Sequence, residues 1–164
     1  MEMEINRIST PETDTTYPKT QDYDSLAIGL SQILADTYTL QHQIEHSQEQ
    51  QSDELSSSVQ KELQHQQEDL SHATNAIAER IYTLVTPGTS EPEITRPSFV
   101  PEVTERQSSS EAIASLVEGH KMVAHHLFGV LSLPETQNND VISSFLNQRA
   151  EIHQNNAQTL RSFL

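Results

Sequence analysis

The chain has 164 residues, a hydrophobic fraction of 34%, an aromatic fraction of 5% and a formal net charge of −15. This length predicts one domain, and the low apolar content favours an assembly whose subunits share buried surface. The nine Lys and Arg residues do not cluster, so we expect no direct binding to nucleic acid, which requires a basic patch. The absence of cysteine excludes disulfides and thiolate metal sites.

The sequence contains neither a candidate membrane-spanning segment nor a recognisable signal segment. No apolar run approaches the ~20 residues that cross a bilayer, and no charged-then-apolar signal precedes the domain, so we expect a cytoplasmic protein without membrane contact. Residues 1–21 are polar and contain Pro11 and Pro18, which predicts a flexible arm before a domain over residues 22–164. The acidic charge would attract cations such as iron, although solubility alone also accounts for it.

Two polar, amphipathic helices are predicted in the first half of the chain. Apolar residues recur at spacings of three and four from about Asp22 to about Ser47. Residues 48–58 fit either a continuation of this helix or its connection to a second helix, from about Ser58 to Val85. The second stripe is interrupted at Gln66 and Gln67, which suits a face turned to a polar cavity or to a wet subunit contact. The two stripes consist of Leu26, Leu30, Ile33, Thr37, Leu40 and Ile44, and of Val59, Leu63, Leu70, Ala73, Ile77, Ile81 and Leu84.

The second half begins with a long connection and continues with two more helices. Four prolines and a glycine prevent a long helix over residues 86–107, so we predict a crossing loop. A helix then starts after Ser108, which has capping-box spacing to Glu111. A turn at residues 134–140 leads into a last helix from about Asp140 to the end. The expected inward residues are Ile113, Leu116, His120, Val123, Leu127 and Val130 in the third helix, and Val141, Phe145, Ile152, Leu160 and Phe163 in the fourth.

The predicted fold is therefore all-α, a four-helix bundle with a long crossover between its second and third helices. Three segments add a resemblance: LADTYTL at residues 34–40, IAER at 77–80, and EIH at 151–153 followed by LRS at 160–162. In this order they resemble the Dps family of mini-ferritins. The resemblance implies a ferritin-like fold and a hollow dodecamer. Such cages oxidise ferrous iron with peroxide or oxygen at centres between paired subunits, store the mineral and limit oxidative damage.

The same resemblance shows that most ligand positions of the family carry other residues here. The first-helix His position falls on Glu45 in an ungapped alignment and on Gln48 in a gapped one. Three second-helix positions hold amides, and Glu79 alone remains of the family's ligands. Neutral amide oxygens replace carboxylates poorly as ligands of a hard cation, so we expect the ordinary iron centre to be weak or absent. The amide positions are Gln60, Gln64 and Asn75, and the expected pore positions are Asn139, Asp140 and Ser144.

Eight histidines in a chain without cysteine suggest a relocated metal centre. His72, Asn75 and Glu79 share a helix face, with His65 one heptad earlier. His72 and Glu79, with His65, are our candidate ligands for iron, or for zinc as the alternative, because neutral imidazole suits both metals. The competing interpretation is that these histidines are solvated or lie at an interface.

Each of the remaining histidines is either a metal ligand or a residue with a structural or solvent-exposed role. His42 and His46 have the spacing at which two imidazoles grip one metal ion, with Glu45 beside them, but simple exposure also explains this spacing. His153 matches a His of the family's last helix and either hydrogen-bonds within the bundle or reaches the metal region. We read His120 as a satisfied core or interface residue, and the pair at 125–126 as surface or interface residues.

Two principal hypotheses follow from the sequence. The first is a Dps-like cage for iron binding, storage and detoxification, with ferrous oxidation at an atypical centre between subunits. The second is a structural or metal-binding shell without oxidation chemistry, which either co-assembles with an active paralogue or holds another ion such as zinc. A plain helical interaction module is a third possibility. No glycine-rich phosphate loop and no nucleophile elbow supports another class of enzyme.

Overall fold

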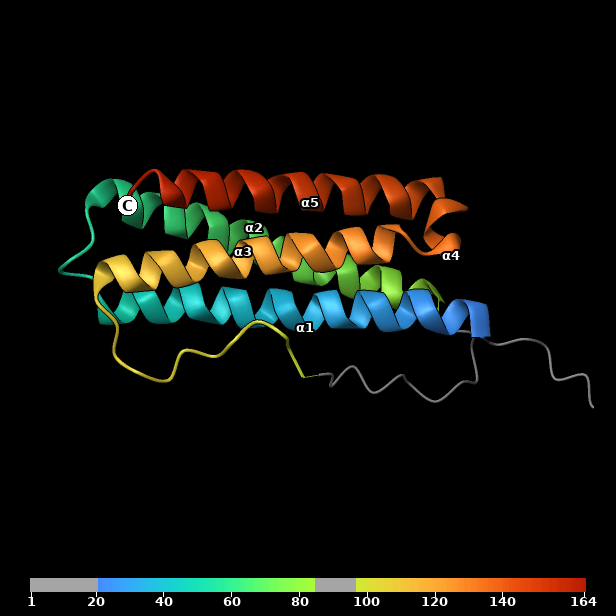
Figure 1. Cartoon of the computed structure of the whole chain (residues 1–164), viewed down its shortest axis with the longest axis horizontal. Coiled ribbons are helices and arrows are strands. Elements are labelled where there is room, and N and C mark those ends of the chain that lie inside the picture. The colour runs from blue at the N-terminus through green and yellow to red at the C-terminus, as the bar shows by residue number, and fades with distance from the viewer. Residues whose placement is uncertain (1–20, 85–96) are drawn as a thin grey trace, which may run out of the picture.

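The computed structural model describes residues 21–84 and 97–164. Nothing is described of the predicted arm before Gln21, of the side chains of residues 21–24, or of the first part of the predicted crossover, residues 85–96. The described residues form five helices and no strand, which confirms the all-α prediction (Figure 1). These helices are α1 (Gln21–Gln50), α2 (Ser57–Leu84), α3 (Ser109–Leu131), α4 (Pro134–Gln137) and α5 (Asp140–Arg161).

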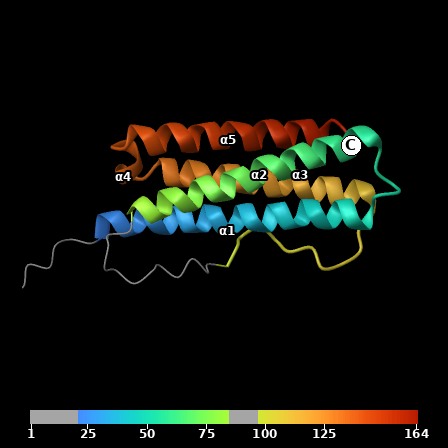
Figure 2. The same cartoon turned by 180° about the vertical axis from the view of Figure 1, so that it is seen from behind.

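The four long helices lie side by side as a bundle, with α1 against α2 and α3 against α5 (Figures 1 and 2). Each of these two pairs is antiparallel, whereas α2 and α3 run in the same direction. The connection between α2 and α3 must therefore return along the length of the bundle, as the sequence predicted. Residues 48–50, left ambiguous by the sequence, complete α1, and residues 51–56 make the turn into α2.

The apolar stripes predicted for the first three helices form the core. Leu30, Leu40, Leu63, Leu70 and Leu127 are 0% exposed, and one continuous cluster joins side chains from all four long helices. Burying such side chains contributes about 1.5–3 kcal/mol each. The predicted stripes are confirmed, with only Leu84 half-buried. The sequence pattern therefore predicted the core residues of the first three helices correctly.

The predicted inward face of the last helix was partly wrong. Val141 is 73% exposed and Phe163 is 37% exposed, whereas the buried positions of α5 lie one residue further on, beginning with Ile142 and Leu146. Phe145 and Ile152 are half-buried, and Leu160 is buried as expected. The face is displaced because Arg149 and His153 point inward, which an apolar count along the helix does not include.

Side-chain caps set the starts of α3 and α5. Ser108 and Glu111 form the predicted capping box, in which each side chain accepts from the other residue's backbone N–H. Asn139 caps α5, and its Oδ1 accepts from the Ile142 backbone N–H at 3.1 Å. Such caps typically contribute about 1 kcal/mol each. Asn139, a predicted pore position, therefore has a clear structural role within a single chain.

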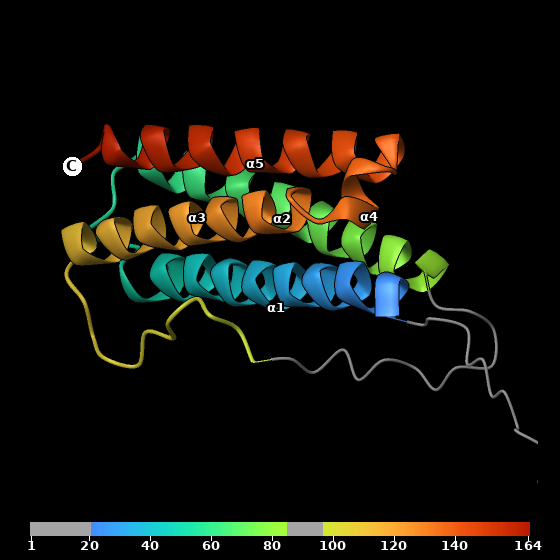
Figure 3. The same cartoon turned by 45° about the vertical axis from the view of Figure 1, so that its right-hand side comes forward.

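The second part of the connection, residues 97–107, is held against α1 and is called the crossover segment here (Figure 3). Two glutamines of α1 and one of the turn that follows it donate from their side-chain amides to backbone carbonyls of this segment: Gln32 to Pro97 at 3.0 Å, Gln43 to Pro101, and Gln51 to Gln107 at 2.9 Å. The crossover segment is thus held partly through its main chain, and its Val100 side chain is buried in the core.

Candidate functional site

The candidate ligands of α2 lie on the outside of the bundle. His65, His72 and Glu79 are exposed, as is Asn75, and we call these four residues the α2 ridge. His72 and Glu79 are seven residues apart, which is about 10 Å along a helix, so within one chain the two do not converge on one ion. Among the described residues, no group of three or more His, Asp or Glu side chains lies close enough to hold a metal ion.

A shallow groove between α1 and α2 is lined mainly by amides, and we call it the amide groove. It brings together two of the predicted ligand positions, Gln48 and Gln64. Gln64 donates to Glu68 at 3.3 Å. Among the residues that line this groove, Glu68 alone has a carboxylate, and none has an imidazole. Its lining residues are Gln41, Gln48, Gln64, Gln67, Glu68 and Ser71.

Two further candidate ligand positions, Gln60 in α2 and Glu45 in α1, have hydrogen-bond partners within the chain. The amide of Gln60 donates to the carbonyls of Ser52 at 2.7 Å and Leu55 at 3.0 Å, so it stabilises the turn between α1 and α2. Glu45 accepts from Gln67 at 2.9 Å and so joins α1 to α2. The amide of Gln60 thus has a structural role in this chain that a carboxylate could not fill, because an amide donates to carbonyls and a carboxylate does not.

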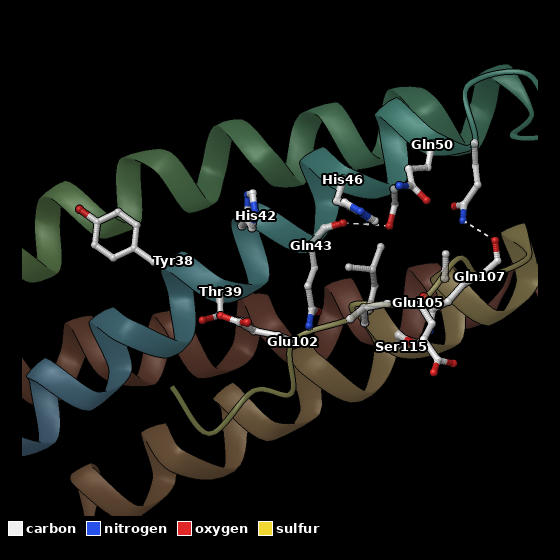
Figure 4. A pocket seen from close by; sticks show the side chains of 15 residues that line it. Tyr38, Thr39, His42, Gln43, His46, Gln50, Glu102, Glu105, Gln107 and Ser115 are labelled. Atoms are coloured by element: carbon white, nitrogen blue, oxygen red, sulfur yellow. Dashed lines mark hydrogen bonds between the residues drawn. The ribbon is translucent and has the colours of Figure 1, made fainter. Parts of the chain in front are cut away.

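His42 and His46 border a cavity of about 290 Å³ between α1, the crossover segment and the start of α3 (Figure 4). The His42 side chain is 82% exposed, with Nδ1 3.8 Å from a Glu45 carboxylate oxygen. Figure 4 shows His42 projecting away from the crossover segment and His46 leaning along α1 toward Gln50, so the two rings do not converge on one point. The cavity is bordered by Glu102 and Glu105 and by no Lys or Arg, which suits a cationic rather than an anionic guest.

A second polar group, found in the bundle interior, joins α2, α3 and α5. His120 Nδ1 lies 3.0 Å from His153 Nδ1, and His120 Nε2 lies 2.9 Å from the amide oxygen of Gln66. Gln66 in turn donates to Glu62 at 2.7 Å. Gln66 and His120 are 0% exposed and His153 is 1% exposed. The gap that Gln66 makes in the apolar stripe of α2 is therefore an internal hydrogen-bonded site within one chain.

An ion pair completes this interior group. Arg149 donates from both terminal nitrogens to the Asp69 carboxylate, at 2.9 Å each, and its Nη2 lies 3.5 Å from His153 Nε2. This bidentate geometry is the strong form of an Arg–carboxylate contact. Glu62, Gln66, Asp69, His120, Arg149 and His153 are together called the core polar chain. His120 and His153 therefore hydrogen-bond inside the bundle, which is one of the alternatives that the sequence allowed for each.

Burial decides the protonation of the two core histidines. Desolvation lowers the pKa of His120 to about 3, with the Arg149 charge acting in the same direction and Asp69 acting against it. Desolvation also holds the pKa of His153 well below its ordinary value, followed by the effects of His120 and Arg149. Both rings are therefore neutral at neutral pH, because a charged ring cannot be solvated there.

A buried carboxylate that the sequence analysis did not single out fixes the crossover segment. Asp36 is 0% exposed and accepts from Ser98 Oγ at 3.0 Å, from the Phe99 backbone N–H at 2.9 Å and from His126 Nδ1 at 2.6 Å. His126 is thus half-buried against Asp36, whereas its neighbour His125 is exposed. The signal in the sequence was an acid directly before Thr37 and three residues after Ile33, two positions of the predicted stripe.

The predicted pore positions do not form an acidic group within one chain. Asn139 caps α5, and Asp140 and Ser144 are exposed in its first two turns.

The described residues also contain no helix that is long and apolar enough to cross a membrane.

Comparison with known proteins supports the fold. No protein-family profile matches the chain, and no curated protein sequence matches it significantly. Among solved structures, the chain is similar to the DPS protein from Vibrio cholerae O1, a member of a broad superfamily of ferritin-like diiron-carboxylate proteins. The TM-score is 0.70 at 17% sequence identity, over 87% of this chain and 90% of the other. The bundle therefore has the ferritin-like fold.

Proposed function

We propose that this protein is a subunit of a Dps-like cage that binds and stores iron and protects against peroxide. The observation that carries the proposal is a ferritin-like fold that extends over 87% of the chain and retains Glu79 and the candidate ligand His72 on the exposed α2 ridge. Iron would be the substrate and cargo of this cage. Ferrous oxidation would take place at an atypical centre between two copies.

The distribution of charge supports assembly through the α1–α2 side. A chain with a net charge of −15 opposes close approach of its own copies. The amide groove contains one acid among six lining residues, so this side offers hydrogen-bonding groups with little charge. The α2 ridge lies on the same helix. A second copy packed here would bring further ligands to His72 and Glu79, which one chain cannot supply.

A second candidate function is a shell that lacks oxidation chemistry and either holds zinc or co-assembles with an active paralogue. The specific observation in its favour is that the amides at two predicted ligand positions, Gln60 and Gln64, make hydrogen bonds within the chain. Gln60 stabilises the α1–α2 turn and Gln64 contacts Glu68, so both amides make contacts within one chain and offer only neutral oxygens to a metal ion. This candidate shares the cage and differs only in its chemistry.

Light scattering after size-exclusion chromatography tests the cage. A mass many times 18.4 kDa supports both candidates, and a monomer contradicts both. Ferrous oxidation is then followed by absorbance, with and without peroxide, for the natural chain, for His72→Ala and for His125→Ala as an exposed control. The first candidate requires oxidation above the uncatalysed rate and its loss in His72→Ala alone. A cage without an iron core that contains stoichiometric zinc supports the second.

A further inference from the structure

The hydrogen bonds of the core polar chain determine where each proton lies. Gln66 donates its amide N–H to Glu62, so its oxygen faces His120 Nε2 and must accept from it. A neutral His120 that carries its proton on Nε2 has a bare Nδ1, which must accept from His153 Nδ1. His153 then has a bare Nε2, which faces the Arg149 guanidinium at 3.5 Å. The two rings are therefore opposite tautomers.

We propose that Arg149, His153, His120, Gln66 and Glu62 form a single directional hydrogen-bond chain that latches α2, α3 and α5 together and opens in acid. Each link of the chain pairs one donor with one acceptor, from the cation at one end to the carboxylate at the other. This arrangement exists only while both rings are neutral. The latch acts within one chain and does not depend on assembly or on iron.

Protonation of either ring breaks the chain because an imidazolium has two donors and no acceptor. A proton on His120 would place two N–H groups against each other across the 3.0 Å between the Nδ1 atoms. A proton on His153 Nε2 would face the Arg149 guanidinium.

The charged groups around the rings come from two helices. They are Glu62 and Asp69 on α2 and Arg149 on α5, while α3 contributes His120 itself. Among the described residues, no acidic or basic side chain of α1 hydrogen-bonds to this group. Asp69 favours a charged His120, but its two oxygens already accept from Arg149, and burial outweighs it.

The sign of the pH dependence follows from proton linkage. Both rings have lower pKa values in the folded state than the ordinary 6.5 of the unfolded chain, so the unfolded chain binds more protons in acid. The contribution of the latch is complete above about pH 6.5. It is lost progressively as the pH falls from 6.5 toward the folded values. Well below 6.5 each ring lowers the folding equilibrium constant about tenfold per pH unit, and the two rings together about 100-fold.

Urea unfolding of the full chain, followed by circular dichroism between pH 7.5 and 5 at one protein concentration, tests the latch. The natural chain should lose close to 100-fold in the folding constant per pH unit at the acid end of this range. His153→Asn keeps a donor toward His120 and removes one titrating ring, so its loss should fall to about tenfold. His72→Asn, a control on the α2 ridge, should match the natural chain. Equal slopes for all three proteins would overturn the proposal.

Nitrogen-15 spectra of the histidine rings test the same chain without any substitution, and decide the question if His153→Asn does not fold. At pH 7 the natural protein should show His120 protonated on Nε2 and His153 protonated on Nδ1. Neither ring should titrate while the protein stays folded. Identical tautomers at the two positions, or a ring that titrates near its ordinary pKa in the folded state, would overturn the latch.

Discussion

The core polar chain and the α2 ridge use the same kinds of side chain in opposite ways. Inside the bundle, both ring nitrogens of His120 and His153 have a partner within 3.5 Å. On the ridge, His65, His72 and Glu79 are exposed. The interior histidines contribute to the structure and have no lone pair free for a ligand, whereas the ridge histidines retain theirs. The metal centre of the proposed function is therefore expected on the outside, where a second copy would complete it.

Removing a charge from the interior should have the largest effect on stability. Asp69→Asn leaves Arg149, whose side chain is 6% exposed, without its anion. We expect a loss of about 3 kcal/mol, the lower end for breaking a buried pair, because 28% of the Asp69 side chain is exposed. Urea unfolding measures this loss. The adjacent exposed Glu68→Gln should change stability by less than about 0.5 kcal/mol. Equal effects of the two substitutions would show that the interior pair has no special weight.

The buried carboxylate of Asp36 should come second. Asp36→Asn exchanges an acceptor of several hydrogen bonds, one of them from His126 at 2.6 Å, for an amide whose nitrogen cannot accept. The expected loss is about 2 kcal/mol, and the crossover segment should become more accessible to proteases. Limited proteolysis and urea unfolding measure the two effects. Asp53→Asn, an exposed acid in the turn before α2, is the control. A resistant crossover segment in Asp36→Asn would contradict the role given to this carboxylate.

Two glycines of α3 allow the inside and the outside of one helix to be compared. A Cβ at Gly129 would meet nothing within 4 Å, whereas a Cβ at Gly119 would lie 2.8 Å from Cδ1 of the fully buried Leu40. Gly129→Ala should therefore stabilise the protein by up to about 1 kcal/mol through helix propensity. Gly119→Ala should lose that gain to overpacking. Thermal unfolding ranks the two variants, and a greater stability of Gly119→Ala would show that the core yields there.

The smallest effect on stability is expected on the α2 ridge. His72→Gln removes an exposed imidazole and should change the free energy of unfolding by less than about 0.5 kcal/mol. The same substitution should lower iron or zinc binding, measured by titration calorimetry on the assembled protein. Normal metal binding together with unchanged stability would remove His72 from the proposed centre. The comparison between interior and ridge would then rest on the interior alone.

The sequence predicted those parts of the fold that depend on neighbours along the chain. The apolar stripes of α1 to α3 and the capping box at Ser108 follow from spacings of three or four residues, and the start of α5 follows from the turn residues directly before it. The inward face of α5 was missed because Arg149 and His153 are inward only through partners on α2 and α3. No property of α5 alone shows that those partners exist.

The candidate site was predictable to a similar extent. Helical spacing placed His72, Asn75 and Glu79 on one face, and the structure places all of them in solvent. The polar gap at Gln66 was visible in the sequence, but two interpretations of it remained, and neither was an internal contact with His120. Asp36 was not noticed because its donors come from the crossover segment, more than 60 residues away in the sequence, and from α3.

The way in which α1 holds the crossover segment has a consequence for evolution and engineering. Gln32, Gln43 and Gln51 bind carbonyl oxygens of that segment, and every amino acid supplies a carbonyl. Exposed positions that contribute only a carbonyl, Pro97 and Pro101, can therefore be changed without loss of these hydrogen bonds, whereas Ser98 and the buried Val100 hold the segment through their side chains.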